Sequence, residues 1–402
     1  MQTQGSLTPI RLIDMQLPEV LAMPALLLMT PAQLKKHIEV VHQQGDLAQL
    51  CMQMYYVFLL ANQYDAALEM QTRALQLGRI YRIAGTQNPQ LRLLVVMGPG
   101  HMQHNTPIEF VLHGSEIQTD ILYLLPDDEV PAVLPTHDVT FVAIGESTKN
   151  TALLGKLNAM LNAWPTTVIN QPHAIPNCAR DTCYQLLKNI PDVILPLTKR
   201  VRKEEDVGMN FPFTLRPIDT QGGEGLQRIA QAEELTNYYA TFPVDEYYAA
   251  KFLDYQSQDG CYRKLRIVLI DGKPYICHMA ISQDWMVHYL SAGMDASPEK
   301  RFEEQHTMEH FEQDFAIRFK DPLAAMAKAL QLDYVTMDCA ESRDGKLIVF
   351  EVDSRGLIHA ADSKEIYPYK LAVMQKAFHA FYALLFNRAG QSSQTALSKV
   401  KK

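Results

Sequence analysis

Two acidic residues near the end of the chain, Asp338 and Glu351, are the strongest indication of chemistry in the sequence. They lie on either side of Asp344-Gly345, and apolar, β-prone runs flank that dipeptide. Asp-Gly between two such runs predicts a β-hairpin. If the dipeptide is the whole loop, Asp338 lies directly opposite Glu351, and Asp353 shares the face of Glu351 because side chains alternate along a strand.

Carboxylates that face each other across two strands repel, and a hard divalent cation would turn that repulsion into attraction. Mg²⁺ is commonly bound by one or two carboxylates together with substrate phosphates. We therefore predict a magnesium site at Asp338, Glu351 and Asp353, with a nucleotide beside it. The alternative is a solvated hairpin whose acids have no joint role, and a three-residue bulged loop would shift the register by one.

The composition is that of a globular protein with more than one domain. The chain has 402 residues, of which 47% are apolar and 20% are charged. Its net charge of -8 argues against a general nucleic-acid binder. The apolar stretch at 17–29 is too short to span a bilayer and lacks the order of a signal peptide. Six scattered cysteines without a Cys-x-x-Cys pair indicate a reducing cytosol, so we expect a cytoplasmic protein.

Residues 1–88 are predicted to form a helical region. Thr30 followed by Pro31 marks a helix start. Apolar periodicity at 46–61 and 64–78 predicts two further helices with a short join between them. This pair resembles a tetratricopeptide helical hairpin, of which one copy is visible. The region is either a plain helical cap or a surface that docks a peptide or protein partner.

The apolar period changes near Leu91, where we expect a parallel α/β domain covering 89–194. Buried strands are indicated by four continuous apolar runs, at 91–97, 121–125, 139–144 and 167–169. Helical stretches such as 150–163 lie between these runs, and strands that alternate with helices are typical of a parallel sheet.

Cationic residues and a glycine-rich loop precede the acidic hairpin. Arg216 ends a predicted strand, and glycines follow it at 222, 223 and 225. Such a loop lets backbone N–H groups approach phosphate oxygens, and a guanidinium at the strand end suits a phosphate. Further along, Lys264 and Arg266 share one face of a strand, and Arg263 lies on the other. The pair is either a clamp for a transferring phosphate or a solvated basic edge strand.

In their order along the chain, the glycine loop, a linker at 251–254, the cationic strand and the acidic hairpin resemble the ATP-grasp superfamily. The similarity is to the branch of the ribosomal-protein glutamate ligases. It implies an ATP-grasp catalytic domain at 195–386, preceded by the α/β domain that these enzymes carry. The expected fold class is therefore α/β and α+β, with a helical N-terminal region. The Ser-, Gln- and Lys-rich end at 387–402 is predicted to be a disordered tail.

The resemblance implies a role for each matching residue. Arg216 would meet ATP phosphates, where family members more often have Lys, and Arg266 would face an acyl phosphate. Lys264, the third residue expected to act in catalysis, stands where the family has Asp, and Asp353 stands where it usually has Asn. The implied nucleotide site comprises Arg216, Gln221, Gly222, Gly223, Gly225, Lys251, Phe252, Leu253 and Asp254.

The activity that the resemblance implies is ligation of a carboxylate to an amine, with ATP and Mg²⁺, through an acyl phosphate. ADP would be the product, and an amino acid or peptide the substrate. Two alternatives stay open, a noncatalytic nucleotide-binding interaction module and a carboxylate kinase. Trp285, His288 and Tyr289 either line an acceptor pocket or pack in the core. His359 is either a structural histidine or a residue that reaches the amine.

Overall fold

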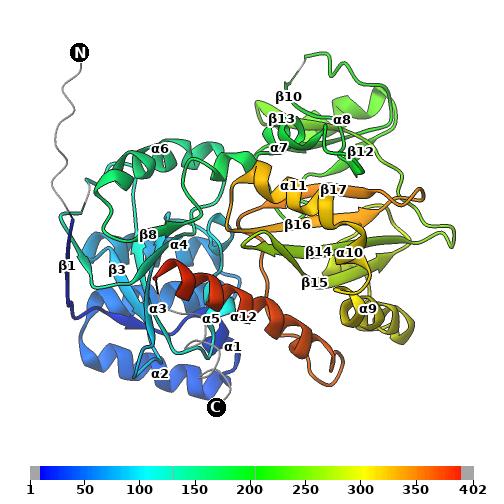
Figure 1. Cartoon of the computed structure of the whole chain (residues 1–402). Helices are drawn as coiled ribbons and strands as arrows, with labels where there is room; N and C mark the ends of the chain where they lie inside the picture. Colours follow the sequence, from blue (N-terminus) through cyan, green and yellow to red (C-terminus); the bar gives the residue numbers. More distant parts are fainter. Residues whose placement is uncertain (1–9, 130, 204, 391–402) are drawn as a thin grey trace. The chain divides into compact units, whose positions relative to one another are not determined.

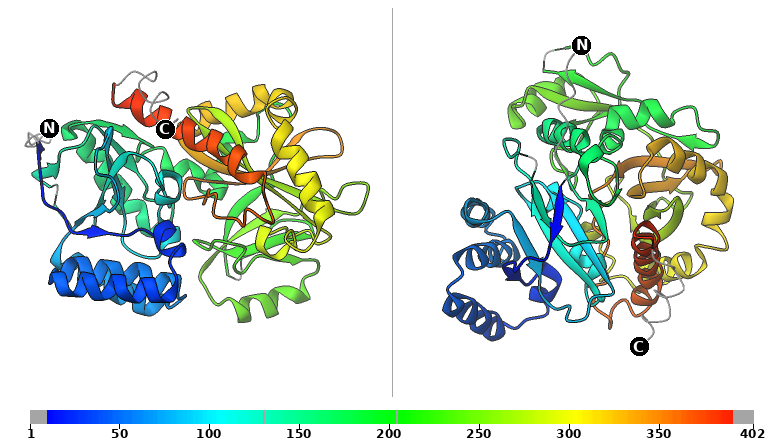
Figure 2. Two further views of the ribbon diagram at one scale, coloured as in Figure 1. Left: turned by 90° about the horizontal axis from the view of Figure 1, so that it is seen from below. Right: turned by 60° about the vertical axis from the view of Figure 1, so that its left-hand side comes forward.

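The computed structural model describes residues 10–129, 131–203 and 205–390 (Figure 1). The chain divides into two compact units. Among the described residues, the first unit comprises 10–175, 355–361 and 378–390, and the second comprises 176–354 and 362–377. Figure 2 shows the same ribbon from two further sides.

The N-terminal part of the first unit is helical between residues 23 and 77, as predicted, but the predicted helical region at 1–88 also contains the strands Arg11–Ile13, Glu19–Val20 and Ile80–Ile83, which sequence reasoning missed. Its helices are α1 (Met23–Leu27), α2 (Pro31–Gln44), α3 (Leu47–Leu60) and α4 (Tyr64–Leu77). Thr30 caps α2: its hydroxyl accepts a hydrogen bond from the Gln33 N–H, and the Gln33 side chain accepts one from the Thr30 N–H. Ala67 and Ala74 of α4 are fully buried. Their small side chains allow α3 and α4 to pack closely.

The rest of the first unit is built on a six-stranded sheet. The strand order is β2 (Glu19–Val20), β3 (Ile80–Ile83), β5 (Ile117–Tyr123), β4 (Leu91–Met97), β7 (Val139–Val142) and β8 (Thr167–Ile169). β5, β4, β7 and β8 are parallel neighbours, which confirms the predicted parallel α/β character. β3 is antiparallel to β5.

One strand of this sheet begins earlier than its apolar run. β5 starts at Ile117, whereas the apolar residues that predict it start at Ile121. The earlier part carries Asp120, which is buried and accepts two hydrogen bonds from Arg82 of β3, at 2.7 and 2.9 Å. A buried charge is tolerated in a strand when it is paired in this way, and the apolar pattern does not show it.

Smaller elements complete the first unit. They are the parallel pair β1 (Arg11–Ile13) and β6 (Val133–Pro135), and the helices α5 (Glu109–Leu112) and α6 (Thr151–Met160). α12 (Lys370–Arg388) is divided between the units at residue 377. In its second half, the Tyr382 hydroxyl donates a 2.8 Å hydrogen bond to the Val111 carbonyl oxygen.

Two sheets form the second unit. The smaller has the order β10 (Thr198–Arg202), β13 (Glu246–Lys251), β11 (Phe213–Pro217) and β12 (Gln227–Ile229). The larger has the order β15 (Lys273–Ser282), β14 (Tyr262–Ile270), β16 (Tyr334–Glu341), β17 (Leu347–Asp353) and β9 (Val193–Ile194). Helices of this unit are α7 (Arg180–Leu187), α8 (Glu233–Thr241), α9 (Pro298–His310), α10 (Phe315–Arg318) and α11 (Lys320–Leu330).

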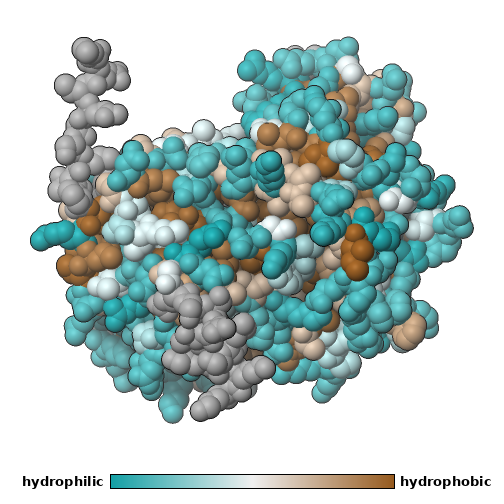
Figure 3. Space-filling model, in the orientation of Figure 1, coloured by the Kyte–Doolittle hydropathy of each residue, from teal (hydrophilic) through white to brown (hydrophobic). Residues whose placement is uncertain are grey.

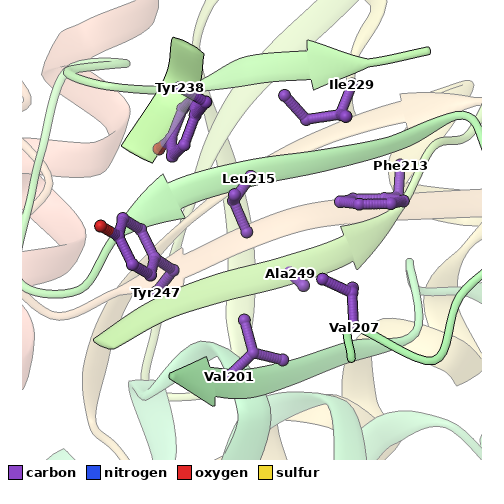
Figure 4. Packing of buried hydrophobic residues seen from close by; sticks show 8 residues of the cluster. All are labelled: Val201, Val207, Phe213, Leu215, Ile229, Tyr238, Tyr247 and Ala249. Carbon is purple, nitrogen blue, oxygen red and sulfur yellow. The ribbon is translucent and has the colours of Figure 1, made fainter. Parts of the chain in front are cut away.

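The smaller sheet has its own hydrophobic core, which Figure 4 shows. Tyr238 of α8 lies over this sheet, and its ring centroid is 5.8 Å from that of Tyr247 of β13. The buried members of the core are Val201, Val207, Phe213, Leu215, Ile229, Tyr238, Tyr247 and Ala249. This core fixes β11, the strand that carries Arg216 next to its last residue and leads into the glycine-rich loop.

The larger sheet shows why the boundary predicted at 194 differs from the division into units. β9 precedes that boundary, yet it pairs with β17 in the second unit. α7 precedes it as well and packs on β10. The unit therefore begins at residue 176. The division into domains at 1–88, 89–194 and 195–386 stays a prediction, and of the predicted tail at 387–402, residues 391–402 lie outside the described part.

Hydrophilic side chains cover most of the face that Figure 3 presents. In the described part of the chain, no helix has both the length and the apolar character that crossing a bilayer requires. The mixed fold class predicted from sequence, with its helical N-terminal region, is confirmed.

Candidate functional site

The hairpin of β16 and β17 places Asp338 opposite Glu351, which confirms the predicted pair. The predicted two-residue turn is wrong, because β16 ends at Glu341 and β17 begins at Leu347. Near the tip the longer turn shifts the pairing by one residue from the pairing predicted for a two-residue turn, so that Glu341 pairs with Leu347. A β-bulge at Phe350 then restores the register, so that Glu351 shares the face of Asp338.

Asp338 is paired with both residues of the cationic strand. Arg266 donates to Oδ1 and Oδ2 of Asp338 at 2.8 and 3.1 Å, and the Lys264 ammonium lies 3.0 Å from Oδ2. These contacts exist because β14 is the direct neighbour of β16. β14 lies inside the sheet, between β15 and β16, so the solvated edge strand considered above is wrong. As predicted, Arg263 turns to the other face, where it pairs with Glu303.

The ion pairs decide the charge state of this cluster. Burial alone would raise the pKa of Asp338, but the charges of Arg266 and Lys264 outweigh burial and hold that pKa well below its usual range. Burial and the charge of Arg266 hold the pKa of His278, its neighbour on β15, well below the ordinary value. At neutral pH the cluster therefore comprises one carboxylate, two cations and a neutral imidazole.

Glu351 has a partner that the sequence did not reveal. The Arg180 guanidinium at the first turn of α7 donates to Oε1 of Glu351. The two residues are 171 positions apart, and no motif surrounds Arg180. One weak signal exists: a cation at a helix N-terminus opposes the helix dipole, which indicates that it serves a contact elsewhere.

Arg216 lies at the end of β11, as predicted, and is buried. Its Nε and Nη2 lie 3.2 and 3.1 Å from Oγ1 of Thr220, and Nη2 also donates to the Thr220 carbonyl oxygen at 2.5 Å. Burial lowers the pKa of Arg216 to about 10, so the guanidinium stays charged at neutral pH. In this structure Arg216 anchors the start of the glycine-rich loop, and its contact with phosphate stays a prediction.

The glycine-rich loop needs glycine at one position for two reasons. Gly225 has a φ of +65°, and a Cβ atom there would lie 2.5 Å from Cδ of Pro217. Gly222 has a similar φ of +60°, but a Cβ atom there would meet nothing within 4 Å. Gly222 therefore serves as a control for the backbone conformation without the clash.

We expect Gly225→Ala to lower the free energy of unfolding by about 2 kcal/mol or more, and Gly222→Ala by about 1 kcal/mol. The difference would come from the contact with Pro217, which the backbone of the loop must move to relieve. Urea unfolding of the two variants measures both values. Equal losses would show that the loop absorbs the extra methyl group without strain.

The segment that follows β13 carries the other residues predicted to bind nucleotide. Lys251 ends the strand and is exposed. Phe252 lies between two side chains: the Arg228 guanidinium is 4.6 Å from its ring centroid, and the Trp285 ring centroid is 5.4 Å away. Asp254 accepts a 3.2 Å hydrogen bond from the Tyr262 hydroxyl. The segment thus has a defined conformation, and its contact with adenine stays a prediction for Lys251, Phe252, Leu253 and Asp254.

Tyr289, one of the residues considered for an acceptor pocket, belongs to a buried polar cluster. Its hydroxyl donates to Glu304 at 2.9 Å, and the Lys370 ammonium lies 4.1 Å above its ring. Glu304 and Lys370 are almost completely buried, and the Tyr369 hydroxyl also donates to Glu304, at 2.6 Å. These contacts favour a packing role for Tyr289. In the first unit, His359 accepts a hydrogen bond from the Ala361 N–H at 3.2 Å.

The described residues do not by themselves form a closed metal cage. Among the described residues, no group of three or more His, Cys, Asp or Glu side chains is placed to bind an ion. Asp353 lies on β17 two residues after Glu351, and its carbonyl oxygen accepts a 2.7 Å hydrogen bond from Thr336. The roles of Asp338, Glu351 and Asp353 as metal ligands stay predictions.

No protein-family model matches the chain, and no curated protein matches it. Solved structures of ATP-grasp ligases are similar to it. A D-alanine–D-alanine ligase from Bacillus anthracis, complexed with ATP, is 15% identical with a TM-score of 0.44, and the match covers 77% of this chain and 99% of that one. The ATP-grasp ligase PsnB, complexed with precursor peptide PsnA2 and AMPPNP, is 14% identical with a TM-score of 0.40, over 75% and 100% of the chains.

A third similar structure is a RimK-domain ATP-grasp protein from Sphaerobacter thermophilus. It is 13% identical with a TM-score of 0.39, and the match covers 71% of this chain and 98% of that one.

Proposed function

We propose that this protein is an ATP-grasp enzyme that joins a carboxylate to an amine at the expense of ATP. The observation that carries the proposal is the pairing of Asp338 with Glu351 on one face of the larger sheet, with Lys264 and Arg266 beside them on the same face. Two carboxylates and several cations at one place are what binding of a metal–triphosphate complex requires.

The carboxylates fit Mg²⁺ by their chemistry. Arg180 contacts Oε1 of Glu351, and within the described residues Oε2 has no hydrogen-bond donor. Each carboxylate oxygen can accept more than one contact. Asp338 and Glu351, with Asp353 as the third proposed ligand, would bind the ion together with phosphate oxygens, which explains why a closed protein cage is unnecessary. The bound ion would neutralise charge on the phosphates.

In the proposed reaction, a substrate carboxylate oxygen attacks the γ-phosphorus of ATP, and ADP leaves. The amine then attacks the carbon of the acyl phosphate, phosphate leaves, and a proton is lost from nitrogen. Arg266 and Lys264 would offset negative charge on the transferring group. Arg216 and the glycine-rich loop would position the phosphates and exclude water, which protects the acyl phosphate from hydrolysis.

Titration calorimetry with a nonhydrolysable ATP analogue, with and without Mg²⁺, tests the nucleotide site. Release of phosphate from ATP, screened against amino acids and peptides, then tests the reaction. We expect Mg²⁺-dependent binding and phosphate release that requires an acid and an amine. A product that contains phosphate but no new amide bond would instead identify a kinase.

One observation favours a second function. Both oxygens of Asp338 already contact Lys264 or Arg266. Lys264 also stands where the pattern of the family that the sequence resembles has Asp. A site of this kind could bind nucleotide without turnover, as an interaction module. Tight binding of the analogue without phosphate release under any condition of the screen would support this function.

A further inference from the structure

A cavity lies in the second unit, where α9 and α10 meet the larger sheet. Its volume is about 620 Å³, which is in the range of small-molecule sites. Arg263 and Leu265 of β14 line it. Because side chains alternate along a strand, these two residues lie on the opposite face of the sheet from Lys264 and Arg266. The cavity is therefore separate from the candidate site described above.

The floor of this cavity is apolar. Leu265 and Met279 come from neighbouring strands, and Phe311 and Phe315 come from the segment that follows α9. All four are at most 5% exposed. A ligand that reaches this floor would contact apolar atoms that offer it no hydrogen bond, so the floor suits an apolar side chain.

The rim carries charges of both signs. Arg263 pairs with Glu303, and Arg318 pairs with Asp314 at 2.6 Å and with Glu341 at 2.6 Å. The three acids and both arginines line the cavity. Each carboxylate has unused acceptor positions beyond these ion pairs. The rim can therefore still accept hydrogen bonds from an ammonium group.

One cation on the rim, Arg343, is bound by a carbonyl oxygen. Arg343 lies in the turn between β16 and β17, and its Nε donates a 2.6 Å hydrogen bond to the Gln256 carbonyl oxygen. Among the described residues, no carboxylate forms an ion pair with Arg343. Its planar guanidinium matches the geometry of a carboxylate. Glu341 lies two positions before it, so an available cation and an acid are close together on one side of the rim.

We propose that this cavity binds a small zwitterion with an apolar side chain, which is the chemistry of a free amino acid or a dipeptide. Its carboxylate would contact Arg343, its ammonium group would contact Glu341 and Asp314, and its side chain would lie on the apolar floor. A polyanion is a less suitable ligand, because the rim acids would repel it. A simple cation is also less suitable, because it has no carboxylate to contact Arg343. The proposal does not depend on the function proposed above.

Titration calorimetry without nucleotide tests this site, with leucine, phenylalanine and dileucine as probes and isoamylamine and N-acetyl-leucine as analogues that each lack one charge. We expect binding of at least one zwitterion and weaker binding of both analogues. Arg343→Gln should weaken binding by about tenfold or more, the loss expected for one charge-assisted contact. Lys346→Gln is the matched control, because Lys346 lies on the same turn, does not line the cavity and pairs with Asp344.

Two further variants locate the site independently of Arg343. Thr307→Trp places a large ring in the cavity, where Thr307 lies, and should abolish binding while circular dichroism stays unchanged. Glu351→Ala, on the other face of the sheet, should leave binding unchanged. Absence of binding for all zwitterions at millimolar concentration would overturn the proposal, and so would equal affinity of Arg343→Gln and Lys346→Gln. Neither result would depend on whether the protein hydrolyses ATP.

Discussion

Replacing Glu351 by alanine should lower turnover in the proposed ligation by roughly 10²-fold or more, because it removes one of the three carboxylates that would hold the metal beside the triphosphate. The fold should remain intact, since the ion pair between Glu351 and Arg180 is partly exposed, with side-chain exposures of 25% and 20%. Mg²⁺-dependent phosphate release measures the turnover, and thermal unfolding measures the stability.

Asp344→Ala is the control for Glu351→Ala. Asp344 is an exposed acid on the turn of the same hairpin, where it pairs with Lys346, and its loss should leave phosphate release unchanged. If Glu351→Ala keeps full activity, Glu351 is not a metal ligand and the assignment of this face as the reaction site fails. If both variants are inactive, the hairpin as a whole is needed for folding and the effect is not specific.

Replacing Asp338 by asparagine should lower the free energy of unfolding by about 3–5 kcal/mol at pH 7. The side chain of Asp338 is only 8% exposed and contacts Arg266 and Lys264. Its loss removes the one carboxylate that both cations contact, in a place that water reaches poorly. Urea unfolding measures the difference. Asp314→Asn is the control, because Asp314 pairs with Arg318 at an exposed position and should cost less than about 1 kcal/mol.

The pH dependence of the same variant gives a second check. The pKa of Asp338 is lower in the folded protein than in the unfolded chain, so the folded state favours the ionised form. The stability from the ion pairs is therefore complete above the ordinary Asp pKa of about 3.9 and is lost as the pH falls toward the folded value. The stability difference between wild type and Asp338→Asn should be constant near neutral pH and shrink in acid. A difference that does not change with pH would contradict the assigned ion pairs.

Local patterns predicted the site to the extent that neighbours in sequence are neighbours in space. The facing of Asp338 and Glu351 was predicted from a two-residue turn, and it holds because the bulge at Phe350 offsets the longer turn that the structure has. The shared face of Lys264 and Arg266 follows from alternation along one strand. The contact between these two pairs could not be predicted from such patterns, because it depends on β14 being the neighbour of β16.

Long-range contacts and buried charges limited the rest of the prediction. Arg180 reaches Glu351 from a helix at the start of the second unit, and the helix itself carries no motif that indicates this contact. Asp120 directly precedes the apolar run of β5, and only its pairing with Arg82 shows why the strand already includes it. The helices at the N-terminus were easier to predict, because capping residues such as Thr30 and the apolar periodicity both act between residues that are close in sequence.

The extra residue at Phe350 makes the length of the turn and the presence of the bulge depend on each other. The turn is longer than the shortest one, and the bulge corrects the resulting offset before the chain reaches Glu351. The Phe350 ring also packs on Tyr255, with centroids 4.7 Å apart. A homologue that shortens the turn by one residue would need to lose the bulge as well, since either deletion alone would turn Glu351 to the opposite side of the sheet. A change in the length of the turn is thus compatible with the position of Glu351 only when the bulge changes with it.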